Sequence, residues 1–334
     1  MTEEQNPGTS QNSHLHKTDR SSPQNREMMN QIVEMIFLLV AWIVLTIYYM
    51  MEGIYRMIWL PAPKSVQGEI VLITGTGHGI GKLLASYYAD AGATVVGWDI
   101  NKANNDETMK EINKKYPNRA RGYVCNVANR ENVLETAQKV QREVGDVKIV
   151  IINAGIMPCH LLEEHSADEI RRIIDINVMQ YFWLIEAFLP SMKKNNCGHI
   201  VGMSSMAGVA GFNNIVPYCA SKYAVRGLME SLRMELRAQS FDNIHITAIY
   251  PHMVNTGLCK NPRIRFDKVL SMLPPEGVAH AVMMAQRRDE IELSLPRYLY
   301  PTINALRLLP FKSQLKAADF LDTGLDSDLL CKNE

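Results

Sequence analysis

The stretch that decides the fold is "EIVLITGTGHGIGKLL", residues 69–84. It begins with an apolar run typical of a buried strand, and a cluster of glycines follows that run directly. A helical segment follows the cluster. A strand that passes through a glycine-rich turn into a helix is typical of a nucleotide-binding βαβ unit. The stretch therefore predicts an α/β fold whose first turn binds phosphate groups.

Each glycine of this turn has its own physical role. Gly75 permits the tight turn, Gly79 lets the backbone approach a pyrophosphate, and Gly81 lets helix and strand pack closely. The free N–H groups at the start of the helix would face the phosphates. An acidic residue, Asp99, ends the next apolar run, residues 93–100. Its carboxylate can accept both ribose hydroxyls and would repel a 2′-phosphate, so the sequence favours NAD, with NADP as the alternative.

From residue 69 onward, short apolar runs alternate with longer helical segments. Long helical stretches are expected at Ser166–Lys194 and Val216–Gln239. The predicted strands are residues 69–74, 93–100, 121–127, 147–155, 199–205 and 244–251. Strands that are apolar throughout and separated by helices indicate a parallel sheet covered on both faces. We expect one Rossmann-type, doubly wound domain over residues 65–295, which binds ligands at the carboxyl ends of its strands.

The stretch "PYCASKYA" carries the second constellation. Tyr218 and Lys222 are four residues apart, so on a helix they share one face. Ser204 and Ser205 end the predicted strand upstream. A free phenol has a pKa of about 10 and is a poor base at neutral pH, but a nearby ammonium and an oxidised nicotinamide would both lower that pKa. Tyr218 would then take a proton from an alcohol; the alternative is an aromatic residue at the edge of the core.

A third feature precedes the domain, the uncharged run "MIFLLVAWIVLTIYYMM" at residues 35–51. It starts too late and is too long for a signal peptide, and Glu34 stands directly before it. We predict a retained membrane anchor over residues 31–60, after a disordered polar tail over residues 1–30. Seventeen helical residues span roughly 25 Å against a hydrocarbon core of ~30 Å, so spanning and re-entrant anchors both stay open. The balanced flanking charges leave its orientation open.

Composition excludes other classes of protein. Lys plus Arg and Asp plus Glu both total 35, without a basic stripe, so a nucleic-acid partner is not expected. Six cysteines are spread singly, and the chain has no N-x-[ST] acceptor. Both features favour a catalytic part that faces the reducing cytosol, and they give no support to a thiolate zinc site. No metal ligand is predicted.

Taken together, these motifs resemble those of the short-chain dehydrogenase/reductase family, over residues 65–295. The resemblance implies a catalytic tetrad: Ser205 hydrogen-bonds the substrate oxygen, Tyr218 is the acid/base, Lys222 holds the nicotinamide ribose, and Asn177 positions a water. The cofactor-binding set then comprises Thr74, Gly75, Gly79, Ile80, Gly81, Asp99, Asn126, Asn153, Ala154, Gly155, Tyr218, Lys222, Pro251, Val254 and Thr256. Two positions depart from the family pattern, Asn126 for the usual Asp and Ile152 for the first Asn of "NNAG".

The anchor and several further stretches resemble a membrane-anchored branch of this family, which contains retinol and 17β-hydroxysteroid dehydrogenases. The resemblance implies the endoplasmic reticulum or lipid droplets as location, and a homodimer through the two long helices; a monomer in sedimentation would contradict the dimer. The residues expected to flank the substrate are Ser205 and the apolar Met157, Met206, Val209, Phe212, Met253 and Val254. We expect an NAD(H)-dependent oxidoreductase of a lipophilic alcohol. The alternative is a membrane or lipid-droplet scaffold of little or no activity.

The C-terminal extension, residues 296–334, is expected to face the membrane or the substrate. The stretch "LSLPRYLYPTINALRLLPF", residues 293–311, is apolar enough to be a second membrane-facing segment. Ordinary core packing is the alternative explanation for the same pattern.

Overall fold

The computed structural model describes residues 23–329, in two compact units that divide after Pro61. The first unit contains the helix α1, Pro23–Ile58, which starts N-terminal of the predicted anchor. Within it, Gln24–Gly53 is long and apolar enough to cross a membrane, and its most apolar window has no buried residue. Most of the predicted polar tail and Cys331 lie outside the described residues.

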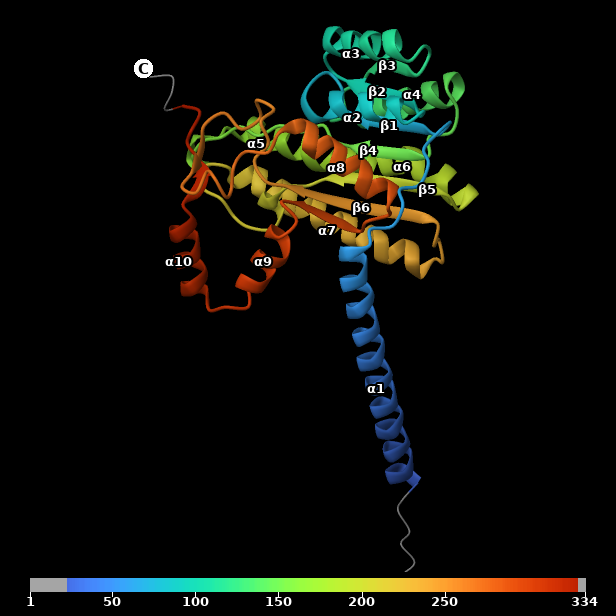
Figure 1. Cartoon of the computed structure of the whole chain (residues 1–334), viewed down its shortest axis with the longest axis vertical. Helices are drawn as coiled ribbons and strands as arrows, with labels where there is room; N and C mark the ends of the chain where they lie inside the picture. The colour runs from blue at the N-terminus through green and yellow to red at the C-terminus, as the bar shows by residue number, and fades with distance from the viewer. Residues whose placement is uncertain (1–22, 330–334) are drawn as a thin grey trace, which may run out of the picture. The chain divides into compact units, whose positions relative to one another are not determined.

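The second unit is built on a seven-stranded sheet with the order β3-β2-β1-β4-β5-β6-β8, and every pair in it is parallel (Figure 1). Its strands are β1 Ile70–Thr74, β2 Thr94–Asp99, β3 Ala120–Val124, β4 Ile149–Ile152, β5 Gly198–Met203, β6 Ile244–Pro251 and β8 Glu292–Leu295. The order reverses between β1 and β4, which is the position where sheets of this kind bind dinucleotides. The predicted Rossmann-type sheet is confirmed.

Helices cover both faces of the sheet. The helices are α2 Gly79–Asp90, α3 Lys102–Lys115, α4 Arg130–Glu143, α5 Ala167–Ile174, α6 Gln180–Asn195, α7 Val216–Ala238 and α8 Pro275–Arg287. One core cluster joins the sheet to α2, α3 and α8, and the other joins it to α4, α6 and α7. Successive residues of β1 alternate between them, since Val71 and Ile73 belong to one cluster and Leu72 to the other. This double coverage explains why the strands are apolar throughout.

The helical stretch predicted from Ser166 is interrupted. Ser166 caps α5, and the chain then forms a π-helical turn, η2 Asp175–Met179, before α6 begins. Short π-helical turns of this kind are frequent at functional sites. Two 3-10 turns, η1 Leu162–Glu164 and η3 Met206–Gly208, complete the loops after β4 and β5. The interruption fixes the place of Asn177, which lies inside η2.

The C-terminal part corrects one expectation. Residues 292–295 form the edge strand β8, and Leu293 is 1% exposed, so the beginning of the predicted membrane-facing stretch 293–311 is core. The chain continues through α9 Leu299–Leu306 and α10 Phe311–Leu321, neither of which has a fully buried residue. It then returns as β9 Thr323–Leu325, which pairs antiparallel with β7 Pro262–Ile264. This return brings the C-terminal residues back to the loop that follows β6.

Candidate active site

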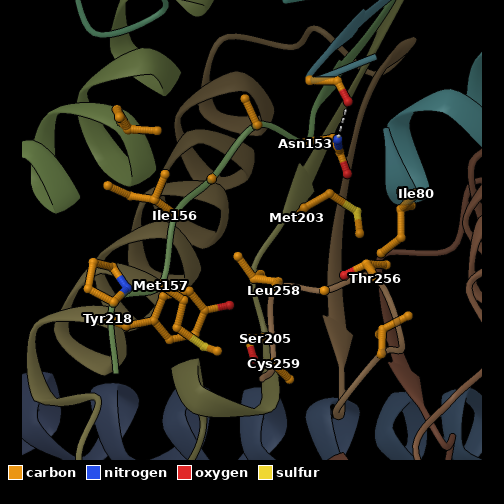
Figure 2. A pocket seen from close by; sticks show the side chains of 18 of the residues that line it. Ile80, Asn153, Ile156, Met157, Met203, Ser205, Tyr218, Thr256, Leu258 and Cys259 are labelled. Carbon is orange, nitrogen blue, oxygen red and sulfur yellow. Dashed lines mark hydrogen bonds between the residues drawn. The ribbon is translucent and has the colours of Figure 1, made fainter. Parts of the chain in front are cut away.

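A cavity of about 1270 Å³ lies at the carboxyl ends of the strands, where the fold predicts a ligand. Its walls come from the turn after β1, the end of β2, and the loops after β4, β5 and β6 (Figure 2). Ser205, Tyr218 and Lys222 line the same cavity as Asp99. The fold thus brings together two groups of residues that are far apart in sequence, one suited to a nucleotide and one suited to proton transfer.

The glycine turn has the geometry that phosphate binding requires. Gly75 and Gly79 have φ angles of 75° and 57°, a region that residues with a Cβ rarely adopt. At Gly81 a Cβ would lie 2.0 Å from the carbonyl oxygen of Gly75, so only glycine fits between helix and strand. α2 begins at Gly79 after His78, whose side chain makes no capping hydrogen bond. The N–H groups of the first turn of α2 therefore stay available to an anion.

Asp99 lies at the end of β2 with its carboxylate in the cavity wall. Oδ2 accepts the N–H of Gly77 at 2.8 Å, and Oδ1 accepts the N–H of Asn101 at 2.8 Å. Each oxygen retains a second lone pair for a ribose hydroxyl. Asn126 also lines the cavity, and its Oδ1 accepts the N–H of Ala128 at 3.2 Å. The turn that follows β3 is therefore held by the residue that departs from the family pattern.

Thr74 braces the end of β1 against the end of β4 from behind the cavity. Its Oγ1 accepts the N–H groups of Asn153 and Ala154, both at 3.0 Å. Asn153 returns a bond from Nδ2 to the carbonyl oxygen of Thr74 at 2.9 Å. Ile152, the second departure, is fully buried, and its carbonyl oxygen accepts the hydroxyl of Tyr181 at 3.1 Å. Thr74 and Asn153 thus hold this strand end, and the side chain of Ile152 packs in the core.

Tyr218 and Lys222 lie in the first two turns of α7, and both are buried. Nζ of Lys222 lies 5.5 Å from the centroid of the Tyr218 ring and donates to the carbonyl oxygen of Met203 at 2.8 Å. Ser205 lies two residues after the end of β5 and caps η3, and its Oγ donates to the carbonyl oxygen of Pro251 at 3.4 Å. Three polar groups suited to an alcohol and its proton therefore line the same cavity, and Figure 2 shows two of them, Ser205 and Tyr218.

In the protein without cofactor, the pKa of Tyr218 differs from the prediction in its direction. Burial raises the pKa of the Tyr218 phenol well above 10, and a hydrogen bond with Ser205 only partly opposes this effect. Burial lowers the pKa of Lys222 to about 8. The sequence predicts that a nearby ammonium and an oxidised nicotinamide lower the pKa of Tyr218, whereas in the protein alone burial of the phenolate raises it. The phenol is thus the resting form, ready to donate a proton.

Asn177 is fully buried and does not line the cavity. Its Oδ1 accepts the N–H of Ile156 at 2.9 Å, and its Nδ2 donates to the carbonyl oxygen of Ile156 and to Oγ of Ser221. A Cβ on Gly155 would lie 3.3 Å from Oδ1 of Asn177 and 3.8 Å from Nζ of Lys222. Asn177 therefore positions the loop that separates it from Lys222.

The structure places most of the predicted site residues on the cavity wall. Of the predicted catalytic and cofactor-binding residues, Thr74, Gly81 and Asn177 lie behind it. The residues of the set that line the cavity are Gly75, Gly79, Ile80, Asp99, Asn126, Asn153, Ala154, Gly155, Ser205, Met206, Phe212, Tyr218, Lys222, Pro251, Met253, Val254 and Thr256. Met157 lines it as well, whereas Val209 is a core residue, so its expected contact with substrate is wrong.

The sequence predicts that the C-terminal extension faces the membrane or the substrate, but it does not identify which of its residues form a wall of the cavity. Leu325, Asp328 and Leu329 line the cavity beside Cys259 and Lys260. Backbone bonds hold this strap, residues 323–329, in place: the N–H of Asp328 donates to the carbonyl oxygen of Cys159 at 2.7 Å. Asn214 Nδ2 donates to the carbonyl oxygen of Leu325 at 2.7 Å. No local pattern marks these contacts, since they join segments more than a hundred residues apart.

Comparison with known proteins agrees with this geometry. The family model for short chain dehydrogenases matches residues 69–264. Mouse epidermal retinol dehydrogenase 2 is 35% identical over 293 residues, covering 88% of this chain and 95% of the relative. Human 17-beta-hydroxysteroid dehydrogenase 13 is 36% identical over 283 residues, covering 84% of this chain and 91% of the relative. The chain belongs to the short-chain dehydrogenase/reductase family.

A further relative and a solved structure also resemble this chain. The bovine short-chain dehydrogenase/reductase family 16C member 6 is 35% identical over 283 residues, covering 85% of this chain and 89% of the relative. A short-chain dehydrogenase/reductase from Burkholderia phymatum, solved in complex with NAD, has a TM-score of 0.66 at 24% identity and covers 73% of this chain and 94% of that one. The latter shows the shared fold. The protein is accordingly an oxidoreductase of the CH–OH class.

Proposed function

We propose that this short-chain dehydrogenase interconverts a lipophilic alcohol and its aldehyde or ketone with NAD(H), at a membrane or lipid-droplet surface. The observation that carries the proposal is the apolar wall, formed by Met157, Met206, Phe212 and Met253, around the polar group of Ser205 and Tyr218. An apolar wall around one polar end suits a substrate with a single reacting hydroxyl on a hydrophobic body. Retinol-type and hydroxysteroid-type alcohols, which the names of the relatives mention, are the candidates.

The residues present fit a bound dinucleotide. The turn from Gly75 to Gly79 would hold the pyrophosphate, Asp99 the ribose of the adenosine half, and Lys222 the nicotinamide ribose. The carboxylate of Asp99 favours NAD over NADP, because a 2′-phosphate would meet a second negative charge. When bound, the cofactor supplies the hydride acceptor or donor.

The chain's own residues supply the proton chemistry. Ser205 would hydrogen-bond the substrate oxygen, and Tyr218 would exchange a proton with it. The raised pKa of Tyr218 keeps its phenol protonated at neutral pH, as reduction of a carbonyl requires. Oxidation of an alcohol requires the phenolate, so its rate should increase at alkaline pH. Burial excludes water from this group and strengthens the electrostatic interactions within it.

The long helix α1 supports a location at a lipid surface, because its side chains are exposed along an apolar segment that is long enough to cross a membrane. We assign the catalytic unit to the cytosolic side of the endoplasmic reticulum or of lipid droplets. The five described cysteines are free, which suits a reducing compartment. A homodimer stays a prediction, and Phe182 and Met234 are exposed apolar residues on α6 and α7.

The experiment that tests the proposal measures reduced-nicotinamide absorbance with membrane-bound full-length protein and NAD. The substrate panel contains retinol, a 17β-hydroxysteroid and a long-chain alcohol. We expect turnover of one panel member, and we expect Tyr218→Phe to reduce kcat by at least 10²-fold, because the phenol is the proton-transfer group. Tyr223→Phe, on the same helix, is the matched control and should retain activity.

Two results would contradict the proposal. Equal turnover by Tyr218→Phe and the wild type would remove the assigned proton chemistry. NAD-induced thermal stabilisation without turnover of any lipophilic alcohol or reduction of any matching carbonyl would favour the alternative function, a scaffold with a cofactor-binding domain.

A further inference from the structure

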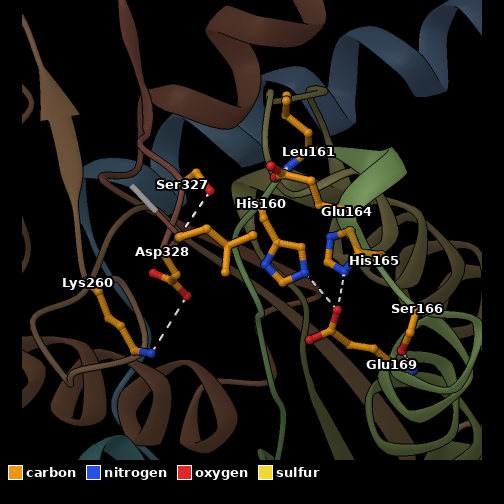
Figure 3. A network of polar contacts seen from close by, with 10 residues as sticks. His160, Leu161, Glu164, His165, Ser166, Glu169, Lys260, Ser327 and Asp328 are labelled. Atoms are coloured by element: carbon orange, nitrogen blue, oxygen red, sulfur yellow. Dashed lines mark hydrogen bonds and ion pairs between the residues drawn. The ribbon is translucent and has the colours of Figure 1, made fainter. Parts of the chain in front are cut away.

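Three side chains that could ligate a metal, those of His160, His165 and Glu169, gather in the loop after β4 and the first turn of α5 (Figure 3). Nε2 of His160 and Nδ1 of His165 each lie 2.7 Å from the same oxygen, Oε2 of Glu169. The ligand atoms of the three residues all lie within 4.8 Å of one another. The dehydrogenase reaction assigned above uses none of them, and the sequence analysis predicted no metal ligand.

The local fold holds the three side chains together. They come from one short segment, residues 160–169, which passes through the turn η1 and ends in the first turn of α5. Oγ of Ser166 accepts the N–H of Glu169 at 3.1 Å, and this cap fixes the start of α5 so that Glu169 lies in its first turn. Oε2 of Glu164 accepts the N–H of Leu161 at 2.8 Å and closes the turn. The three side chains therefore already lie together in the protein alone.

The chemistry of the cluster suits a particular class of ion. Two imidazole nitrogens and one carboxylate oxygen form the protein ligand set of open zinc sites, which keep a fourth position for water. Imidazole nitrogen disfavours magnesium and calcium, which prefer oxygen ligands. Zinc bonds of about 2.0–2.1 Å would separate neighbouring ligand atoms by roughly 3.3 Å, slightly more than the hydrogen bonds between them. Glu169 can make this movement, because its side chain is 30% exposed.

The cluster is also open to the cavity. His160 and Glu169 line the cavity that contains Ser205 and Tyr218, whereas the His165 side chain is 0% exposed and anchors the cluster from behind. An ion would enter through the cavity, without opening of the core. Arg172, one helical turn after Glu169, lines the cavity too and faces solvent enough to move away from a cation.

We propose that His160, His165 and Glu169 bind a zinc ion in the wall of the substrate cavity. Resident zinc sites normally fix each imidazole through a hydrogen bond to its second nitrogen. Here Nδ1 of His160 and Nε2 of His165 are buried without a hydrogen-bond partner in the described chain. Loss of such partners costs about 10- to 100-fold in affinity. The site therefore holds an exchangeable ion, one that responds to zinc concentration.

Equilibrium zinc binding tests the proposal on detergent-extracted full-length protein that has been stripped with a chelator. A chromophoric zinc chelator competes with the protein, and Co²⁺ substitution reports a four-coordinate site through its visible absorption. We expect one ion per chain whose affinity falls at least 10-fold in Glu169→Gln and in His165→Gln. Glu163→Gln and His280→Gln, both exposed and outside the cluster, are matched controls and should bind as the wild type does.

The outcomes separate this site from adventitious binding. Zinc held by other histidines contributes equally to all variants and cancels in the comparison. NAD-induced thermal stabilisation of each variant shows that it has folded. Equal zinc affinity in Glu169→Gln and the wild type, or no zinc binding by the wild type, would overturn the proposal. In that case the three side chains only hydrogen-bond one another to hold the loop. Neither result bears on alcohol turnover, so the two proposals fail separately.

Discussion

At the scale of single residues, Asp99 illustrates how one side chain connects fold and function. Its two oxygens hold the N–H groups of Gly77 and Asn101, so the carboxylate is fixed at the edge of the cavity. A Cβ on Gly77 would lie 2.9 Å from Oδ2 of Asp99, which shows how tightly the glycine turn packs against it. A fixed negative charge at this point discriminates between the two nicotinamide cofactors more strongly than a mobile one would.

The first prediction concerns cofactor choice. Asp99→Ser removes the charge that repels a 2′-phosphate and one acceptor for the ribose hydroxyls. We expect kcat/KM with NAD to fall about 10-fold or more, and the preference for NAD over NADP to fall by a similar factor. Steady-state kinetics with both cofactors check this. Asp106→Asn, an exposed carboxylate on α3, is the control, and an unchanged preference in Asp99→Ser would contradict the assignment.

The residues that could be predicted are those whose role follows from local chemistry. Residue type and spacing are enough to predict the glycine turn, Asp99 and the pair Tyr218 and Lys222. The structure places each of them in the cavity wall. The pKa of Tyr218 could not be predicted, because it depends on how much water the folded protein excludes. The cluster of His160, His165 and Glu169 could not be predicted either, because the spacing of these residues matches no common metal motif and only the fold brings their ligand atoms together.

At the scale of elements, the sequence periodicity located the helices and strands better than their interruptions. The π-helical turn η2 lies inside a continuous helical pattern, so nothing in that pattern separates α5 from α6. The predicted membrane-facing stretch includes residues of the edge strand β8, because the apolar residues of this strand continue into those of α9. A short apolar run does not reveal whether a sheet or a lipid will cover it.

The second prediction concerns the C-terminal strap, residues 323–329. Leu325 is 3% exposed and packs in the cluster that contains Met157, Tyr218 and Met253. Leu325→Ala would open a void beside the substrate end of the cavity and leave the nucleotide end unchanged. We expect KM for the lipophilic substrate to rise about 3- to 10-fold, as one lost apolar contact of about 1 kcal/mol predicts.

Separate KM values for substrate and NAD check this prediction, with Leu315→Ala as the control because Leu315 is exposed on α10. A parallel rise in the KM for NAD would show a general loss of structure, and an unchanged substrate KM would remove the strap from the substrate cavity.

At the scale of the whole molecule, the chain combines a catalytic unit, which has its own core, with the long apolar helix α1. Both clusters that join the sheet to its covering helices lie in the unit that begins at Ala62. The linker enters this unit through Lys64, whose N–H donates to the carbonyl oxygen of Arg287 at 2.7 Å, while Nε of Arg287 donates back to the carbonyl oxygen of Lys64. The catalytic unit therefore has its own fixed starting point, independent of α1.

The last prediction follows from this division. A chain that begins at Ala62 should fold and bind NAD as the full-length protein does, because it contains the sheet and the whole cavity. It should leave the membrane fraction on centrifugation, since the exposed apolar side chains of α1 are gone. Its kcat/KM should stay within about twofold on a short alcohol in solution and fall at least 10-fold on a substrate dispersed in vesicles, because tethering raises the effective concentration near lipid.

Detection of the N-terminal residues in the mature full-length protein excludes cleavage of α1 as a signal. Retention of the shortened chain on membranes with unchanged activity on the vesicle substrate would show that α1 is not what brings the enzyme to its substrate.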